Sequence, residues 1–217
     1  MSQNRSHAVM AQRIEPHDSL DHFPTPPWAT RALFEHVIQN RVKRTCWEPA
    51  CGTGEMSLVI QEYWPSTFAS DVHDYGWGHA QHDFLQPYLP EGMRETMTEI
   101  EWIITNPPFR LAQEFVERSL SIVTIGVAIL VRSVFIESIE RYNELFKRRP
   151  PGIMAQFVER VPMVKGRLDR KASTATSYCW LVWPSKSVPR EFIDTRLQWI
   201  PPCRAHLERS TDYGDTP

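Results

Sequence analysis

The sequence lacks the features of a membrane or secreted protein. Its longest apolar run, residues 122–131, is half the length of the roughly 20 residues that a spanning helix needs, and Thr124 and Gly126 interrupt it. The first twenty residues contain no apolar core of a secretion signal. We therefore expect a protein that stays in the cytoplasm and does not associate with a membrane.

Cysteine and excess charge are also scarce. In a reducing compartment the 4 cysteines are expected to be free thiols. They include no Cys-x-x-Cys pair, so the sequence does not indicate a structural zinc site. Three histidines, His73, His79 and His82, lack the regular spacing of a metal site, so we expect no metal. Lys and Arg (24) nearly balance Asp and Glu (26), and because indiscriminate polyanion binding needs clustered positive charge, this balance disfavours it while allowing a local basic patch.

Proline, by contrast, is abundant and marks the segment boundaries. The 18 prolines outnumber the 9 glycines and gather at doublets such as Pro26-Pro27 and Pro107-Pro108. Residues 1–22 and 185–217 are polar and without sustained periodicity, which is typical of tails. A chain of 217 residues suits one domain better than two, so we predict a single domain over residues 23–184.

Apolar spacing predicts alternating strands and helices in this domain. Helical spacing occurs at residues 28–38, 56–63, 111–121 and 136–147. Short apolar runs typical of strands occur at residues 46–48, 67–72, 102–105, 126–131, 153–158 and 178–183. The alternation indicates an α/β fold whose parallel sheet is covered on both faces. Only a polar segment separates the last two strands, which predicts an antiparallel hairpin at the sheet edge.

A glycine turn follows the first predicted strand. The segment Glu48-Pro49-Ala50-Cys51-Gly52-Thr53-Gly54 lies where that strand ends and a helix begins. Sheets of this class bind cofactors at the carboxyl ends of their strands, where glycines let the backbone approach a ligand closely. Asp71 ends the next predicted strand, and a carboxylate there can accept hydrogen bonds from both ribose hydroxyls. An ordinary tight turn is the alternative, but the flanking strand, helix and acid favour a nucleoside cofactor.

Nicotinamide and flavin cofactors use a similar turn. Their pattern has Gly or Ala three residues after the second glycine, where this chain has Ser57, and makes no use of an acid before the turn. Glu48 occupies that position, and its carboxylate suits a cofactor with a cationic amino head. The residues therefore favour S-adenosylmethionine over a nicotinamide cofactor.

A second motif, Asn106-Pro107-Pro108-Phe109, follows the strand at residues 102–105. An amino group on an aromatic ring is a poor nucleophile because its lone pair is delocalised. The amide oxygen of Asn106 and the carbonyl of Pro107 can accept its N–H groups and stabilise the positive charge that develops during attack. Phe109 offers a flat face on which a base can stack. The alternative is a strand that simply stops at a double proline. The two motifs follow what would be the first and fourth strands of a doubly wound sheet, and because these strands are neighbours in such a sheet, both motifs can share one pocket.

Together these elements resemble a class I S-adenosylmethionine-dependent methyltransferase of the amino-methylating DNA type. They are similar in particular to small adenine-specific enzymes of bacteria and phages, such as those of restriction–modification systems. The resemblance covers residues 23–184 and rests on Phe-Pro-Thr-Pro-Pro at 23–27, the segment 48–54, Asp71, His82-Asp83-Phe84, the segment 106–109 and a basic hairpin ending at Trp183-Pro184. It implies a Rossmann-like fold with a mostly parallel, seven-stranded sheet and an antiparallel edge hairpin.

The resemblance also implies residue roles. Cofactor-binding residues would be Phe23 and Thr25 over the methionine part, Glu48, Ala50, Gly52 and Gly54 along the methionine and ribose, Asp71 at the ribose hydroxyls, and Asp83 and Phe84 at the adenine. The target amino group would be held by Asn106, Pro107 and Phe109. Methyl transfer would be a direct displacement without a metal or a covalent enzyme intermediate.

A basic segment lies between the last two predicted strands. Its candidate nucleic-acid-binding residues are Arg160, Met163, Lys165, Arg167, Arg170 and Lys171. The basic side chains could hold phosphates and Met163 could press on a flipped base, although a solvated charged loop is an equal alternative. Many related DNA enzymes add a long target-recognition domain, whereas only residues 185–217 follow this hairpin. We therefore expect a short or relaxed recognition sequence, or one read by the hairpin loop.

The sequence thus predicts methyl transfer from S-adenosylmethionine to the N6 amino group of adenine in DNA, after the base is flipped out of the duplex. The same motif could serve RNA or a glutamine side chain of a protein. A noncatalytic partner subunit that binds cofactor or nucleic acid is a further alternative.

Overall fold

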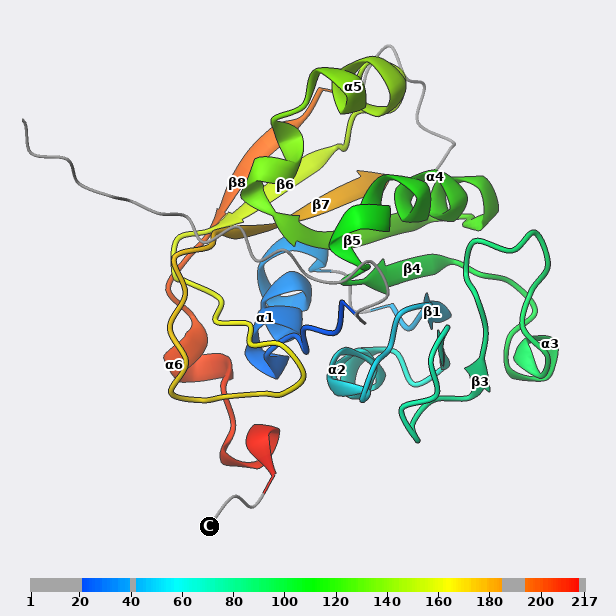
Figure 1. The fold of residues 1–217 in the computed structure, drawn as a ribbon, viewed down its shortest axis with the longest axis horizontal. Coiled ribbons are helices and arrows are strands. Elements are labelled where there is room, and N and C mark those ends of the chain that lie inside the picture. The colour runs from blue at the N-terminus through cyan, green and yellow to red at the C-terminus, as the bar shows by residue number, and fades with distance from the viewer. Residues whose placement is uncertain (1–20, 40–41, 185–193, 215–217) are drawn as a thin grey trace, which may run out of the picture.

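A computed structural model describes residues 21–39, 42–184 and 194–214, which form three layers with a sheet in the middle (Figure 1). The strands are β1 Cys46–Glu48, β2 Thr67–Asp71, β3 Ala80–Gln81, β4 Trp102–Thr105, β5 Gly126–Arg132, β6 Ile153–Phe157, β7 Tyr178–Pro184 and β8 Arg196–Ile200. Their order is β3-β2-β1-β4-β5-β7-β6-β8, and β7 alone among these strands runs against its neighbours. The predicted α/β class and the six predicted strands are confirmed.

Short helices connect and cover the strands. The α-helices are α1 Pro27–Ala32, α2 Glu55–Tyr63, α3 Met93–Thr96, α4 Ala112–Ile122, α5 Ile139–Arg141 and α6 Arg204–Leu207. Pro27 begins α1 at a position where a missing N–H costs nothing, and a π-helical turn, Leu33–Ile38, continues it. The helix expected over residues 136–147 is instead the short α5 and a π-helical turn, Tyr142–Phe146. No helix in the described part of the chain is both long and apolar enough to span a membrane.

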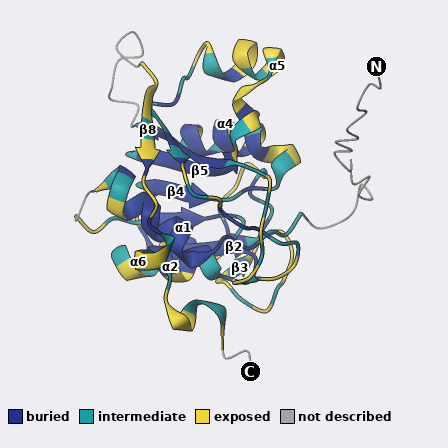
Figure 2. Cartoon of the chain, turned by 90° about the vertical axis from the view of Figure 1, so that its left-hand side faces the viewer, coloured by how far each residue is buried: buried dark blue, intermediate teal, exposed yellow. Residues whose placement is uncertain are grey.

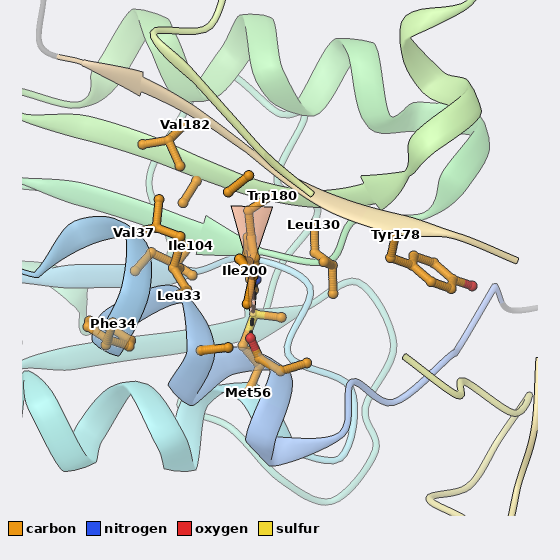
Figure 3. Close-up of a cluster of buried hydrophobic side chains, with 14 of the residues drawn as sticks. Leu33, Phe34, Val37, Met56, Ile104, Leu130, Tyr178, Trp180, Val182 and Ile200 are labelled. Atoms are coloured by element: carbon orange, nitrogen blue, oxygen red, sulfur yellow. Dashed lines mark hydrogen bonds between the residues drawn. The ribbon is translucent and has the colours of Figure 1, made fainter. Parts of the chain in front are cut away.

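The sheet separates two hydrophobic cores. On one face α1 and α2 pack against residues such as Ile104, Leu130 and Trp180, which Figure 3 shows as one cluster. On the other face α4 packs Phe115 and Val116 against the sheet. The colouring in Figure 2 shows the central strands as the most buried part of the molecule. Burial on both faces explains why these strands are visible in the sequence as continuous apolar runs.

The sheet has eight strands rather than the seven expected. The hairpin of β6 and β7 is antiparallel as predicted, but β7 lies inside the sheet against β5, and β8 covers the outer edge of β6 in parallel. The sequence gives little sign of β8 because Leu197 and Trp199 are exposed and Ile200 is its one buried residue. Backbone pairing with β6 rather than apolar burial holds this strand.

The prediction that residues 185–217 form a tail is therefore wrong for residues 194–214, which fold onto the domain. Residues 1–20, 185–193 and 215–217 lie outside the described residues. Arg31 of α1 donates to both carboxylate oxygens of Asp212, at 2.8 and 2.9 Å, and to Glu62 at the end of α2. The side chains of Arg31 and Asp212 are only 4% and 3% exposed. This buried ion pair joins the C-terminal segment to both helices on one face of the sheet.

We expect Asp212→Ala to lower the free energy of unfolding by about 3 kcal/mol, because it leaves part of the Arg31 charge buried and unpaired. Urea denaturation followed by circular dichroism measures the loss. Asp169→Ala is the matched control, since Asp169 pairs with the exposed Arg167 and such surface pairs contribute less than about 1 kcal/mol. Equal losses in the two variants would show that the buried Asp212 pair stabilises the fold no more than an exposed pair does.

Candidate active site

The two sequence motifs meet at the carboxyl ends of neighbouring strands. β1 pairs with both β2 and β4, so the glycine turn after β1, Asp71 at the end of β2 and Asn106 after β4 face one another. They border a cavity of about 270 Å³. Of the expected site residues, those lining it are Phe23, Thr25, Glu48, Ala50, Gly52, Asp71, Asp83, Phe84 and Asn106.

The glycine turn owes its shape to backbone conformations that favour glycine. Gly52 and Gly54 have φ angles of 52° and 96°. The backbone N–H of Gly52 donates to Oδ2 of Asp71 at 2.9 Å, so the turn and the acid are fixed against each other. The His22 ring covers Gly52 so closely that a β-carbon there would lie 2.5 Å from it.

Gly54 and Trp77 form a separate contact beside the cavity. A β-carbon on Gly54 would lie 2.3 Å from the Trp77 indole, and Gly54 is not among the residues that line the cavity. The structure therefore places Gly54 beneath a tryptophan. Its expected contact with a cofactor stays a prediction.

Glu48 is a buried carboxyl at the cavity wall. Its side chain accepts a hydrogen bond from the Ser57 hydroxyl, and the residue is 2% exposed. Burial raises its pKa well above the ordinary value, and the hydrogen bond from Ser57 opposes that rise. No cation pairs with Glu48 among the residues that the structure describes. A cationic group that entered the cavity would supply the missing charge. The sequence identified Glu48, but not Ser57 as its partner, because Ser57 stands on the next helix.

The amide of Asn106 is held in one orientation. Its nitrogen donates to the backbone carbonyl of Phe23 at 3.0 Å and to Oγ1 of Thr25 at 3.1 Å. Its oxygen is buried and has no hydrogen-bond partner in the described part of the chain. A buried acceptor without a donor costs roughly 1–3 kcal/mol, and an N–H group from a ligand would offset that cost.

Pro108 of the second motif also lines the cavity, whereas Pro107 and Phe109 do not. Pro107 is buried, and Phe109 is half-buried with its ring centre 5.3 Å from that of Phe23. The guanidinium carbon of Arg132 lies 3.9 Å from the centre of the Phe109 ring. The backbone N–H of Phe109 donates to Asp21 at 2.6 Å. Both residues follow Asn106 closely in the chain, so they lie near the cavity without lining it.

The basic segment lies against the site but uses several of its charges internally. Met163 is buried, with its sulfur 3.7 Å from the Asn106 nitrogen, and the Gly166 N–H donates to the His22 carbonyl at 2.9 Å. Arg160 donates to the Ala175 carbonyl at 3.0 Å, and Arg170 pairs with Glu208 at 3.4 Å.

The remaining basic residues of this segment are less buried than Met163. Arg167 pairs with Asp169 at 3.3 Å, Lys165 is half-buried and Lys171 is exposed. The segment thus borders the site, but Arg167 and Arg170 are already paired with carboxylates.

The histidines considered for a metal have other partners. Nδ1 of His79 accepts the Ala69 N–H at 3.0 Å, and its ring stacks on Phe68. His82 packs against Trp47. Within residues 21–39, 42–184 and 194–214, no group of three or more potential metal ligands comes together.

Three further residues at the site have no clear signal in the sequence. His22 stacks near Tyr75 with ring centres 4.6 Å apart, and both line the cavity. Arg132 ends β5 and reaches the Phe109 ring. Each comes from a segment distant in sequence from the residue that it contacts, so only the folded chain reveals these contacts.

No protein-family model matches this chain, and no curated protein matches its sequence significantly. Solved structures show its fold. A proposed class I S-adenosylmethionine-dependent methyltransferase from Listeria monocytogenes is 13% identical with a TM-score of 0.52, over 83% of this chain and 67% of that one. The M protein of the type I restriction enzyme EcoKI is 12% identical with a TM-score of 0.53, over 79% of this chain.

A proposed RNA methyltransferase from Pyrococcus horikoshii has 10% identity and a TM-score of 0.53, over 79% of this chain and 90% of that one. The chain spans 45% of the length of the EcoKI M protein. At these identities the comparisons show the fold alone, an α/β fold of the class I methyltransferase kind.

Proposed function

We propose that this protein transfers a methyl group from S-adenosylmethionine to the N6 amino group of adenine in DNA. The observation that carries the proposal is the buried Asn106 oxygen, which has no donor among the described residues, while the nitrogen of the same amide is held by Phe23 and Thr25. An acceptor fixed in this way in the wall of a nucleoside-sized cavity suits an amino group brought in by the substrate.

The cavity residues fit the proposed cofactor. The Glu48 carboxyl, which is buried and has no cation partner in the described part of the chain, would pair with the amino head of the cofactor. Asp71 would accept hydrogen bonds from the ribose hydroxyls. Asp83 and Phe84 would contact its adenine, and Phe23 and Thr25 would close over its methionine part. When bound, this cofactor supplies an electrophilic methyl group.

On the substrate side the chain would prepare the amino group for attack. Asn106 Oδ1 and the Pro107 carbonyl would each accept one N–H, which holds the nitrogen toward tetrahedral geometry and stabilises the positive charge that develops on it. The two prolines restrict the backbone, so these acceptors are in place before the substrate arrives. Phe109 would stack on the base, and the surplus proton would leave to solvent.

DNA is the substrate class that we favour. The basic segment carrying Arg160, Lys165 and Lys171 lies beside the site, where it could contact phosphates. The likeness in fold to the M protein of a type I restriction enzyme supports DNA, and the likeness to a proposed RNA methyltransferase makes RNA the main competitor.

The test offers labelled S-adenosylmethionine to the protein with unmethylated genomic DNA, total RNA and a glutamine-containing protein substrate together. We expect label in DNA, recovered as N6-methyladenine after hydrolysis, and sequencing of the product would map the modified positions. Label in RNA or protein would replace DNA as the substrate. Cofactor binding without transfer to any acceptor would instead indicate a noncatalytic subunit.

Asp71→Ala should weaken S-adenosylmethionine binding by roughly 10- to 100-fold, because it removes a charged acceptor and frees the Gly52 N–H that shapes the turn. Isothermal titration calorimetry measures the change. Asp74→Ala is a close control, since Asp74 also accepts a backbone N–H, that of Gly76, but does not line the cavity. The assignment of Asp71 would be wrong if both variants bound the cofactor like the unaltered protein.

A further inference from the structure

Arg132 is the last residue of β5, whose neighbour β4 leads into the 106–109 motif. The next residue, Ser133, holds the backbone in place. Its N–H donates to the Ser177 carbonyl at 2.9 Å and its hydroxyl donates to Gln156 at 2.8 Å. The residue itself is exposed. A long charged side chain therefore extends from a rigid base at the outer side of the site.

The guanidinium of Arg132 lies where a substrate would meet the protein. Its carbon Cζ lies 3.9 Å from the centre of the Phe109 ring, and Arg132 stands opposite Tyr178 in the antiparallel pairing of β5 with β7. Figure 3 shows the Tyr178 hydroxyl pointing away from the hydrophobic cluster. A flat cation on an aromatic ring occupies the same kind of surface that a stacked base would use.

Arg132 also differs from the arginines of the neighbouring basic segment. Arg167 and Arg170 each have a carboxylate partner, whereas Arg132 forms no ion pair with a carboxylate of the residues that the structure describes. A guanidinium held by a contact with an aromatic ring can turn to bind an anion. Its planar fork of N–H groups matches the oxygens of a phosphate.

We propose that Arg132 forms a phosphate-binding site for the target nucleotide. The base displaces the guanidinium from Phe109, and the guanidinium then binds the phosphate of the same nucleotide at the outer side of the site. This inference rests on the proposed function, because it takes the occupant of the Phe109 ring to be a nucleobase. It adds a residue outside both sequence motifs and outside the basic segment of residues 160–171.

The test measures binding of a fluorescein-labelled single-stranded dA12 oligonucleotide by fluorescence anisotropy over a series of salt concentrations. In this probe every base is an adenine, and none has to be unpaired from a duplex. We expect Arg132→Gln to weaken binding by roughly 10- to 100-fold at low salt. The slope of log affinity against log salt should fall by about 0.7, which corresponds to the loss of one phosphate contact on a single strand.

Two further variants separate a phosphate contact from other causes. Arg141→Gln is the matched control, because Arg141 also lies over a phenyl ring, that of Phe135 at 4.4 Å, and its loss removes the same charge. It should leave affinity and slope unchanged. Arg132→Lys keeps the charge and should retain the slope, whereas a purely structural role would make it resemble Arg132→Gln. Unchanged binding of S-adenosylmethionine by each variant shows that the fold is intact.

The outcomes distinguish this inference from the proposed function. Suppose that the unaltered protein methylates DNA. The role of Arg132 is then refuted, and the function stands, if Arg132→Gln binds dA12 as tightly as the unaltered protein. The same holds if Arg141→Gln weakens dA12 binding as much as Arg132→Gln does. If the protein neither binds dA12 nor transfers methyl groups to nucleic acid, both are refuted.

Discussion

Asn106→Ala should reduce methyl transfer by at least about 100-fold while leaving cofactor affinity within a few-fold. The variant removes the cavity-lining amide oxygen that has no hydrogen-bond partner among the described residues, and removal of a single preorganised group of this kind costs about 10²–10³ in rate. Incorporation of labelled methyl groups into DNA measures the rate, and calorimetry measures cofactor binding.

Asn143→Ala supplies the control for this prediction, because Asn143 is an exposed asparagine in the turn after α5. It should methylate like the unaltered protein. Equal incorporation by Asn106→Ala and the unaltered protein would remove Asn106 from the mechanism. A variant that loses transfer and cofactor binding together would show instead that Asn106 mainly positions Phe23 and Thr25.

Glu48→Gln should weaken S-adenosylmethionine binding by at least roughly 30-fold, because it removes the buried charge that we propose pairs with the amino head of the cofactor. Since burial raises the pKa of Glu48, the carboxyl must release a proton before it can form this pair. Affinity of the unaltered protein should therefore fall about tenfold per pH unit below that pKa, whereas the variant should show no such dependence. Calorimetry in two buffers of different ionisation enthalpy measures the released proton.

The same substitution should stabilise the protein in the absence of cofactor. A raised pKa means that the folded protein keeps a proton that the unfolded chain releases, so the stability contributed by Glu48 is full below its ordinary value of 4.5 and is lost as the pH rises through the raised value. The melting temperature of Glu48→Gln should then be higher than that of the unaltered protein at pH 8, and the two should be equal near pH 4. Glu91 is exposed, so Glu91→Gln should leave the melting temperature unchanged at both pH values. A lower melting temperature for Glu48→Gln at pH 8 would contradict the cost of the buried charge.

The strands predicted best are those buried on both faces. The predicted strand at residues 102–105 coincides with β4, and the run at 126–131 falls within β5, because every residue of these runs is buried. Two strands had no such signal: β3 has only two residues, Ala80–Gln81, and β8 exposes Leu197 and Trp199. The long helix expected over residues 136–147 fails because Ile139, a residue of its apolar pattern, is 86% exposed.

The parts of the site that consist of contiguous residues could be predicted from the sequence. The glycine turn and the 106–109 motif are contiguous, so their shape follows from glycine and proline, and β1 and β4 are neighbours as expected. Contacts made across the fold could not be predicted. The Thr25 hydroxyl on Asn106, the Ser57 hydroxyl on Glu48 and the Arg132 guanidinium on Phe109 join segments whose distance only the folded chain fixes.

The buried pair of Arg31 and Asp212 bears on how the protein can be shortened. A fragment ending at residue 184, the boundary that the sequence suggests, would lack both Asp212 and β8. Arg31 would keep Glu62 but lose its second carboxylate, and the outer edge of β6 would present unpaired backbone groups to other molecules. Such edges recruit further strands, so a trimmed fragment should self-associate more strongly than the longer chain.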